Sequence, residues 1–283
     1  MTPISLAVAH VFAALVGLVI GSFLNVVIYR VPAGIPLTRA SQCPACDAPV
    51  RPWQNVPVVS WLVLRGKCTS CGTPISGRYP LVELATGLAF VGVSWWLVDA
   101  FRLAWPGEGP EVVLATPEFW PILVAFLYLA AISIALTLVD LDTRRLPNPI
   151  VLPSYVVLGA LFTLACVLGA PWEALLRAAI GGAALFAFYS LLRLIRPGGM
   201  GGGDVKLAGV LGLALGWVGW GALVVGAFAA FVLGGIFGVA LLVLRRAGRT
   251  SAIPFGPWMI AGAWVGILAG ELLAQLYLGL LAG

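Results

Sequence analysis

The strongest constraint on how this chain can fold is a series of long apolar stretches that recurs from one end to the other. Eight of them can be separated, at roughly 5–29, 81–98, 119–139, 149–170, 174–195, 207–217, 219–244 and 257–280. Most are near the length of about 20 residues at which an α-helix crosses the hydrocarbon core of a bilayer. We therefore predict an all-α polytopic membrane protein with about eight transmembrane helices.

The composition excludes a soluble globular protein. Only 10% of the 283 residues are charged and 61% are hydrophobic, whereas a soluble domain carries about 25% charged residues. The net charge of +5 would favour nucleic acid if it lay on a soluble surface. In a membrane protein the position of each charge matters more than the sum, so we expect a lipid bilayer, and no nucleic acid, as a partner.

The distribution of basic residues predicts the orientation, because cytoplasmic loops carry an excess of Lys and Arg. The loop at 30–80 is basic and is predicted to be cytoplasmic, whereas the acidic loop at 99–118 is predicted to face outward. With eight spans and both termini outside, only Arg102 and Arg177 of the 16 basic residues lie on the outer side. A seven-span alternative, with the sixth and seventh stretches fused, would place the basic cluster at 245–249 on the wrong side.

Two Cys-x-x-Cys motifs lie in the basic loop: Cys43 with Cys46 and, after 21 intervening residues, Cys68 with Cys71. Two such pairs can place four thiolates around one tetrahedral Zn²⁺ ion, as in closed structural sites. The alternatives are a redox pair, which needs one motif rather than two, and disulfides, which are rare on a cytoplasmic face. We predict a structural zinc site that leaves no open coordination position for catalysis. Cys166, inside an apolar stretch, is expected only to pack.

Three acidic residues lie at the predicted cytoplasmic ends of apolar stretches, where an ionisable side chain is costly and marks a functional site. Asp140 and Asp142 end the third stretch, and Asp204 precedes the sixth. Each has an ordinary explanation: Asp140 or Asp204 could cap a helix, and Asp142 could pair with Arg144 or Arg145, the reading that we favour for Asp142. Helix packing could instead bring Asp140 and Asp204 together as two carboxylates that share a proton, as in aspartic proteases.

A glycine-rich segment at 198–203 comes directly before Asp204. Such a backbone can adopt positive φ and allow close approach of another chain. A phosphate-binding loop is the alternative, but no strand precedes the segment and no Walker lysine–hydroxyl pair follows it. We interpret it as an opening where an extended peptide can lie beside Asp204. The next stretch, 207–217, would form a helix of only about 16 Å, and so short a helix implies backbone that lines a watery cavity.

These motifs together resemble the GxGD group of membrane aspartic proteases and, within it, the bacterial prepilin peptidases. Gly201-Gly202-Gly203-Asp204 matches the motif that names the group. In family order, the likeness also covers 21–30, the four-cysteine loop with Gly66 and Lys67, Glu83, 140–148, 200–207 and 253–257. The resemblance therefore extends over nearly the whole chain.

The resemblance implies an enzyme that removes the short basic leader of type IV prepilins and related pseudopilins, after a glycine and on the cytoplasmic side of the inner membrane. The family's first catalytic aspartate lies six residues before the hydrophobic residue of an Ile/Leu-Pro motif. Counting back from Leu146 gives Asp140, and the second aspartate is Asp204. Bacterial members with the cysteine loop also methylate the new N-terminal amine with S-adenosylmethionine, and the resemblance links Gly66 and Lys67 to that methyl transfer.

No strand–glycine-rich turn–helix pattern for a nucleoside cofactor is present in the sequence. Any site for S-adenosylmethionine must therefore be built from the cytoplasmic loop or from helix ends. In the loop beside the aspartates, Gly201 and Gly203 are expected to border the active site. Lys206 is expected to lie on the side of its helix or near lipid headgroups, and not to act as the base.

The predicted organisation has four segments: a first transmembrane helix at 1–29, a cytoplasmic zinc domain at 30–80, a second helix with the acidic outer loop at 81–118, and a six-helix peptidase core at 119–283. A proton-coupled transporter is the rival from another class. It predicts acids at the bilayer midplane and repeat symmetry, whereas Asp140 and Asp204 lie at the cytoplasmic border. A weaker alternative is an inactive membrane scaffold organised by zinc. The presence of both aspartates argues against it.

Overall fold

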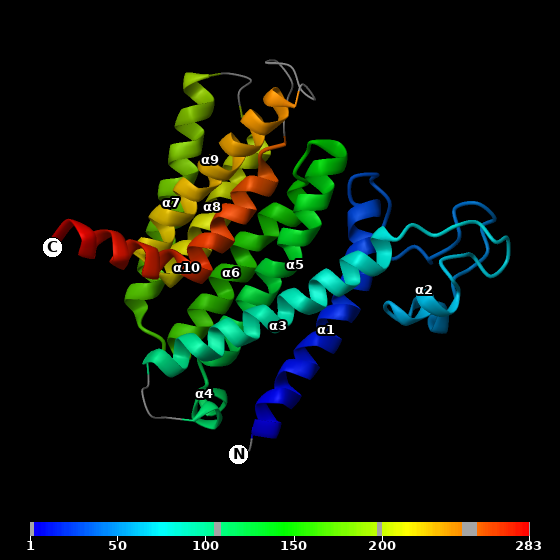
Figure 1. Cartoon of the computed structure of the whole chain (residues 1–283), viewed down its shortest axis with the longest axis horizontal. Helices are drawn as coiled ribbons and strands as arrows, with labels where there is room; N and C mark the ends of the chain where they lie inside the picture. Colours follow the sequence, from blue (N-terminus) through cyan, green and yellow to red (C-terminus); the bar gives the residue numbers. More distant parts are fainter. Residues whose placement is uncertain (1–2, 105–108, 197–199, 245–253, 283) are drawn as a thin grey trace. The chain divides into compact units, whose positions relative to one another are not determined.

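The apolar stretches form long α-helices in the computed structural model, which describes residues 3–104, 109–196, 200–244 and 254–282 (Figure 1). The long helices are α1 (Pro3–Arg30), α3 (Arg78–Ala104), α5 (Phe119–Thr143), α6 (Asn148–Leu168), α7 (Trp172–Ile195), α8 (Gly202–Val218), α9 (Trp220–Val243) and α10 (Gly256–Ala282). Each predicted stretch thus corresponds to one helix. Among the described residues, seven of these helices are long and apolar enough to cross a membrane, and α8 is the shorter one.

Three short elements that the apolar pattern does not predict lie between the long helices. They are η1 (Pro52–Asn55), α2 (Val59–Val63) and α4 (Pro110–Ala115). The chain packs as two compact units: Met1–Thr116 with Phe126–Ala135, and Pro117–Ala125 with Leu136–Gly283. Helix α5 therefore contributes its middle to the first unit and its two ends to the second.

In the first unit, α1 and α3 lie side by side (Figure 1). A methyl group added to Gly17 of α1 would lie only 2.7 Å from the Cα atom of Gly87 on α3, so the two backbones touch at these glycines. Small residues of this kind drive helix association in membranes, because lipid offers no hydrophobic driving force between helices. Trp96 of α3 packs edge-on against Phe126 of α5, with ring centroids 5.0 Å apart.

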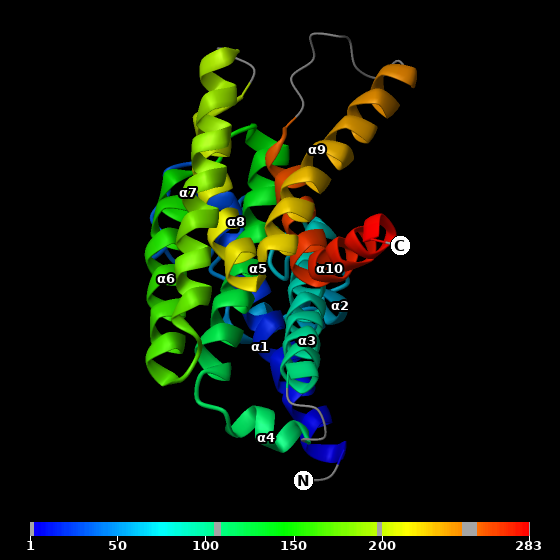
Figure 2. The same ribbon diagram turned by 90° about the vertical axis from the view of Figure 1, so that its left-hand side faces the viewer.

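In the second unit, α7 packs along α8 and α9 packs along α10 (Figure 2). A methyl group on Gly212 of α8 would clash with the backbone of Gly181 on α7, and one on Gly262 of α10 would clash with the backbone of Ala230 on α9. Cys166 of α6 is buried, in agreement with a packing role. Helix contact through small residues therefore organises this unit too.

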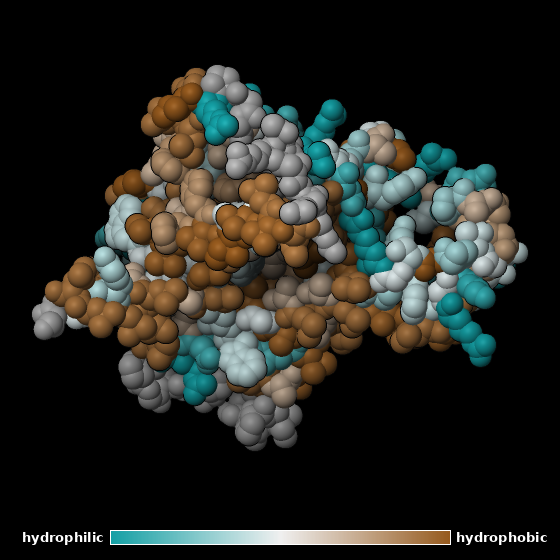
Figure 3. Space-filling model, turned by 45° about the horizontal axis from the view of Figure 1, so that its top comes forward, coloured by the Kyte–Doolittle hydropathy of each residue, from teal (hydrophilic) through white to brown (hydrophobic). Residues whose placement is uncertain are grey.

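Large apolar side chains cover much of the outer surface of the helices. On α1, for example, Val11, Phe12, Leu15 and Val19 are each more than half exposed, at 60%, 67%, 56% and 61%. On the face that Figure 3 draws, the helices are mostly brown, and the segment between α1 and α3 has more white and teal. Since a soluble protein would bury such side chains, these faces are suited to contact lipid.

Helices α8 and α9 are separate and meet at Gly219, so the seven-span alternative with one fused helix is wrong. The predicted bounds of α8 are also wrong, because the helix begins at Gly202 and not at 207. Its 17 residues correspond to about 25 Å rather than 16 Å, and Gly202 and Gly203 are helical rather than part of an open loop. The cavity inferred from a very short helix therefore loses its support.

Two charged side chains satisfy the helix ends at this junction. Arg177 of α7 donates from Nε to the carbonyl of Gly216 over 2.7 Å and from Nη2 to that of Trp217 over 2.8 Å. Glu271 of α10 accepts a hydrogen bond from the N–H of Gly221 over 2.9 Å. The positive Arg177 thus lies at the C-terminus of α8, which carries partial negative charge, and the negative Glu271 lies at the N-terminus of α9, which carries partial positive charge.

Candidate active site and metal centre

The two Cys-x-x-Cys motifs adopt the same backbone turn. The N–H of Asp47 donates to the carbonyl of Cys43 over 2.9 Å, and the N–H of Gly72 donates to the carbonyl of Cys68 over 3.0 Å. Asp47 and Gly72 occupy equivalent positions and both have positive φ, 55° and 72°. Glycine takes this conformation without strain, and Asp is among the few other residues that tolerate it. The repeated turn gives the two thiol pairs equivalent backbone settings.

The sulfurs of Cys43, Cys46, Cys68 and Cys71 gather into one cluster, as their spacing predicts. All four lie within 4.8 Å of one another, and those of Cys43 and Cys71 are 3.8 Å apart. Four sulfurs placed tetrahedrally around zinc at about 2.3 Å would be about 3.8 Å apart. A hydrogen bond with the side chain of Thr73 lowers the pKa of Cys71 to about 6. The pKa of Cys46 is raised instead, because the hydrogen bond with the backbone of Ala48, which lowers it, is outweighed by hydrogen bonds with the neighbouring thiols, so the metal-binding thiolate is favoured at Cys71 but not at Cys46. These cysteines could therefore hold one metal ion.

Gly66 and Lys67 differ in their surroundings. Gly66 has a φ of 63° and lies against the indole ring of Trp61, since a methyl group there would come within 2.9 Å of Cζ2. The indole N–H of Trp61 in turn donates to the carbonyl of Ile75 over 3.1 Å. Gly66 thus shapes the loop through packing, whereas Lys67 lines a pocket.

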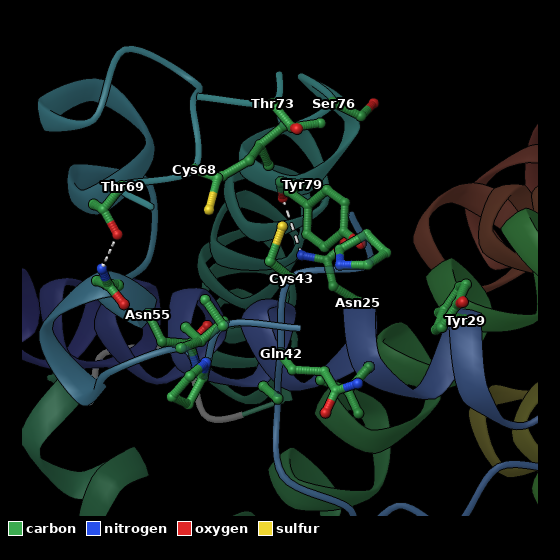
Figure 4. A pocket seen from close by; sticks show the side chains of 18 of the residues that line it. Asn25, Tyr29, Gln42, Cys43, Asn55, Cys68, Thr69, Thr73, Ser76 and Tyr79 are labelled. Carbon is green, nitrogen blue, oxygen red and sulfur yellow. Dashed lines mark hydrogen bonds between the residues drawn. The ribbon is translucent and has the colours of Figure 1, made fainter. Parts of the chain in front are cut away.

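That pocket has a volume of about 620 Å³, which is within the usual range for ligand sites. One wall is the C-terminal end of α1 with Asn25 and Tyr29, another is the start of α3 with Tyr79 and Glu83, and a third is formed by the two cysteine turns. Figure 4 shows Asn25 reaching across to the backbone of Tyr79, to whose carbonyl its Nδ2 donates over 3.1 Å. The pocket therefore joins two helix ends to the cysteine loop.

Asp140 lies in the last turn of α5 and is buried, with 4% of its surface exposed. Its Oδ2 accepts a hydrogen bond from the N–H of Gly256, the first residue of α10, over 3.1 Å. A side chain at Gly256 would not fit, because its Cβ would lie 2.7 Å from that same oxygen. Helix α5 ends soon afterwards, where Arg144 takes a left-handed conformation with φ of 54°. Asp140 is thus held between the end of one helix and the start of another.

Asp204 lies in the first turn of α8 and is half-buried. Its Oδ2 accepts a hydrogen bond from the N–H of Gly201 over 3.0 Å. Gly201 is the N-cap residue and Asp204 is the third residue of the helix, so the carboxylate reaches back over the helix start. The capping alternative considered for Asp204 is therefore correct in kind, although Asp204 is not the N-cap itself. Capping by one oxygen does not exclude a second role for the carboxylate.

The carboxylates of Asp140 and Asp204 lie close enough to interact electrostatically. Leu146 links their surroundings. A methyl group on Gly203, directly before Asp204, would lie 2.8 Å from the Cβ of Leu146, and one on Gly256 would lie 3.5 Å from its Cδ1. The fold therefore brings together the two aspartates that the sequence analysis pairs, with glycines where the backbones approach.

The neighbouring polar residues have other partners or positions. Lys206 donates from Nζ to Oδ1 of Asn148 at the start of α6 over 2.9 Å, and Asp142 is exposed. Arg193, in the last turn of α7, lies against the start of α8, where a methyl group on Gly202 would be 2.5 Å from its Nη1. The sequence pattern does not single out Arg193 or the N–H of Gly256, because their positions beside Gly202 and Asp140 arise only from helix packing.

Family models match two parts of the chain. Residues 15–97 match the bacterial peptidase A24 N-terminal domain, and residues 127–239 match the type IV leader peptidase family. Together these matches cover more than half of the chain.

Several curated proteins named prepilin leader peptidase/N-methyltransferase are similar to the chain over most of its length. The protein from Stutzerimonas stutzeri is 35% identical, with 98% of each chain covered. The one from Pseudomonas putida is 35% identical over 92% of this chain and 90% of the relative, and the one from Neisseria gonorrhoeae is 36% identical over the same shares. No solved structure matches the chain significantly.

Proposed function

Because the chain belongs to the type IV leader peptidase family, we propose that it is a membrane aspartic endopeptidase that removes the basic leader of type IV prepilins and pseudopilins after a glycine. The observation that carries this proposal is that the end of α5 with Asp140, the start of α8 with Asp204 and the start of α10 pack together around Leu146. Two neighbouring aspartates are the catalytic groups of an aspartic protease.

In the proposed mechanism the two aspartates share one proton, because two adjacent carboxylates cannot both be charged at low cost. The charged carboxylate takes a proton from water while the water oxygen attacks the carbonyl carbon of the scissile peptide bond. The protonated carboxyl donates to the carbonyl oxygen, and the tetrahedral intermediate then breaks its C–N bond as the leaving nitrogen takes up a proton. The N–H of Gly256 orients the carboxylate of Asp140 during these steps.

The substrate docks with its apolar helix among the transmembrane helices and with its basic leader near the cytoplasm. The proposed orientation has the zinc loop and both aspartates on the cytoplasmic side of the inner membrane and both termini outside. The bias of basic residues toward the loops assigned to the inside supports this orientation. Gly201 and Gly203 border the active site, and Lys206 has no direct chemical role.

The proposed organisation keeps a zinc domain at 30–80 between the first and second transmembrane helices, and a peptidase core at 119–283. The four cysteines hold a structural Zn²⁺ ion, whose coordination they would fill without leaving a position for a reactant. S-adenosylmethionine supplies a methyl group for the new N-terminal amine when it is bound. Lys67 contributes to methyl transfer from the pocket that it lines, and Gly66 contributes by shaping the loop.

The test is incubation of the purified protein in detergent with a prepilin, followed by mass spectrometry of the substrate. The proposal predicts loss of a leader-sized mass and a free N-terminus directly after a glycine. Added labelled S-adenosylmethionine should transfer its label to that new N-terminus. A protein that leaves the prepilin intact under these conditions, while it remains folded, would favour the transporter or scaffold alternatives.

A further inference from the structure

We propose that the pocket between α1, α3 and the two cysteine turns binds S-adenosylmethionine, and that Glu83 recognises the positive charge of this ligand. The inference rests on the methyl-transfer part of the proposed function, and it assigns the cofactor to particular residues. It is independent of Asp140 and Asp204, which belong to the other compact unit.

The first observation is a buried carboxylate that lines the pocket and forms no ion pair with the described basic side chains that also line it, which are Arg30, Arg39 and Lys67. Glu83 is 7% exposed and lines the pocket. Its Oε2 accepts a hydrogen bond from the N–H of Val58 over 2.7 Å, and the described part of the chain provides no Lys or Arg within ion-pair distance of it. Burial of an uncompensated charge is unfavourable, so a cationic ligand would gain more here than in an ordinary polar pocket.

The second observation is the strained turn that Glu83 holds. Val58 has φ of 61° and ψ of −49°, and the N–H of Val59 donates to the carbonyl of Pro57 over 2.6 Å. This is a γ-turn with positive φ, which is rare and is unfavourable for a β-branched residue. Such strain persists where the surrounding structure enforces it, often at ligand sites. The hydrogen bond from Val58 fixes one carboxylate oxygen of Glu83 and ties the loop to α3.

The third observation is that the pocket carries both signs of charge. Lys67 lines it together with Glu83, which suits the amino-acid end of S-adenosylmethionine with its ammonium and carboxylate groups. Asn25 offers an amide oxygen in addition to the Nδ2 that it donates to Tyr79, and Tyr29 and Tyr79 offer aromatic rings for adenine or for the sulfonium. The volume of about 620 Å³ accommodates a ligand of this size.

A basic side chain of the substrate leader is the other cation that could approach Glu83. Its charge would be met by Glu83, but it would bring no carboxylate for Lys67. The pair of opposite charges therefore favours the zwitterionic cofactor over the peptide.

In the methyl-transfer step, the lone pair of the neutral N-terminal amine forms a bond to the methyl carbon of the sulfonium. The carbon–sulfur bond breaks and its electron pair remains on sulfur, which leaves S-adenosylhomocysteine. The amine carries the positive charge after transfer and loses a proton to water. Positive charge thus passes from the sulfur to the methylated amine, while S-adenosylhomocysteine keeps the ammonium and carboxylate groups that suit Glu83 and Lys67.

The first test is equilibrium binding of tritiated S-adenosylmethionine to the purified full-length protein in detergent. Glu83→Gln keeps the size of the side chain and an acceptor for Val58 but removes the charge, so we expect binding to weaken about tenfold or more. Asp99→Asn is the matched control, because this exposed carboxylate lies on the same helix and pairs with Arg102. It should bind as the wild type does. Equal affinity for Glu83→Gln and the wild type would overturn the assignment.

The second test does not depend on a variant. Ultraviolet cross-linking of labelled S-adenosylmethionine to the wild type, followed by peptide mapping, should place the label on segments between 22 and 83. Label confined to 136–283 would overturn the proposed pocket while leaving methyl transfer intact. A wild type that neither binds nor transfers the methyl group would instead overturn the methyl-transfer function itself, and the prepilin cleavage assay would still report separately on the peptidase. Zinc content verifies that Glu83→Gln retains the folded loop.

Discussion

The two candidate sites of this protein are built by opposite means. In the cysteine loop, the thiols come in local pairs on short turns, are partly exposed, and form a cluster that could hold a metal ion. In the aspartate site, Asp140 and Asp204 come from the ends of two long helices and are placed by helix packing. We expect the cysteine site to depend on an added ion and the aspartate site to depend on the close approach of backbones. Each should therefore fail in its own way.

Glycine has a different role in each site. In the cysteine loop, Gly72 supplies a positive φ in open surroundings, with no atom within 4 Å of an added Cβ. In the aspartate site, Gly203 and Gly256 lie where an added Cβ would meet Leu146 or the carboxylate of Asp140 at 2.8 Å and 2.7 Å. The first site uses the backbone freedom of glycine, and the second uses its small size.

The largest expected effect concerns the carboxylates. Asp140→Asn and Asp204→Asn should each lower the cleavage rate by about 10³-fold or more, because neither variant can shuttle a proton through the altered group. Both should retain the metal of the cysteine loop. Asp142→Asn, one helical half-turn away and exposed, should cleave within about twofold of the wild type. Normal cleavage by Asp140→Asn together with loss in Asp142→Asn would show that the wrong aspartate has been assigned.

Removal of one thiol should abolish metal binding in the cysteine loop without affecting the aspartate site. Cys68→Ser leaves three thiolates, so the protein should lose its metal to a mild chelator, and the loop should lose a large stabilising term of the order of the 10–16 kcal/mol measured for structural zinc in small domains. Metal content by mass spectrometry and helix content by circular dichroism check this prediction. Cys166→Ala, which removes a buried thiol outside the cluster, should keep the metal. Loss of metal in both variants would point to general misfolding.

A methyl group should be enough to disturb the aspartate site. Gly256→Ala and Gly203→Ala force atoms apart in a packed region, at a cost of about 1–3 kcal/mol, and we expect cleavage to slow by about tenfold. Gly159→Ala in α6 is the control, since an added Cβ there meets no atom within 4 Å. It should leave the cleavage rate and the metal content unchanged. An equally slow Gly159→Ala would mean that the two glycines carry no special steric requirement.

The smallest effects concern charges that hold helix ends. Arg177→Ala leaves the C-terminal carbonyls of α8 without their donor, so the free energy of unfolding should fall by about 1–3 kcal/mol. Arg102→Ala removes only an exposed ion pair with Asp99 and should cost less than about 1 kcal/mol. Thermal unfolding in one detergent compares the two. Equal stability of both variants would show that α8 does not depend on Arg177.

Features set by local sequence could be predicted, and features set by packing or by backbone strain could not. The cysteine cluster could be predicted because each cysteine pair is closed by its own turn, and the long helices could be predicted because lipid demands apolar stretches. The start of α8 was missed because a hydropathy pattern counts Gly202, Asp204 and Lys206 as polar, although the first turn of a helix favours an acidic residue. The γ-turn at Val58 could not be predicted, because a β-branched residue gives no local signal for positive φ.

The central claim is that Asp140 and Asp204 act as one catalytic unit, and a double-mutant comparison tests it most directly. The cleavage rates of Asp140→Asn, Asp204→Asn and the double variant should be measured on one prepilin in one detergent. If the carboxylates share a proton, the double variant should be no slower than the slower single variant, because either change already disables the pair. The account would be contradicted if the fold-loss in cleavage rate of the double variant equalled the product of the two single losses. It would also be contradicted if either single variant cleaved at the wild-type rate.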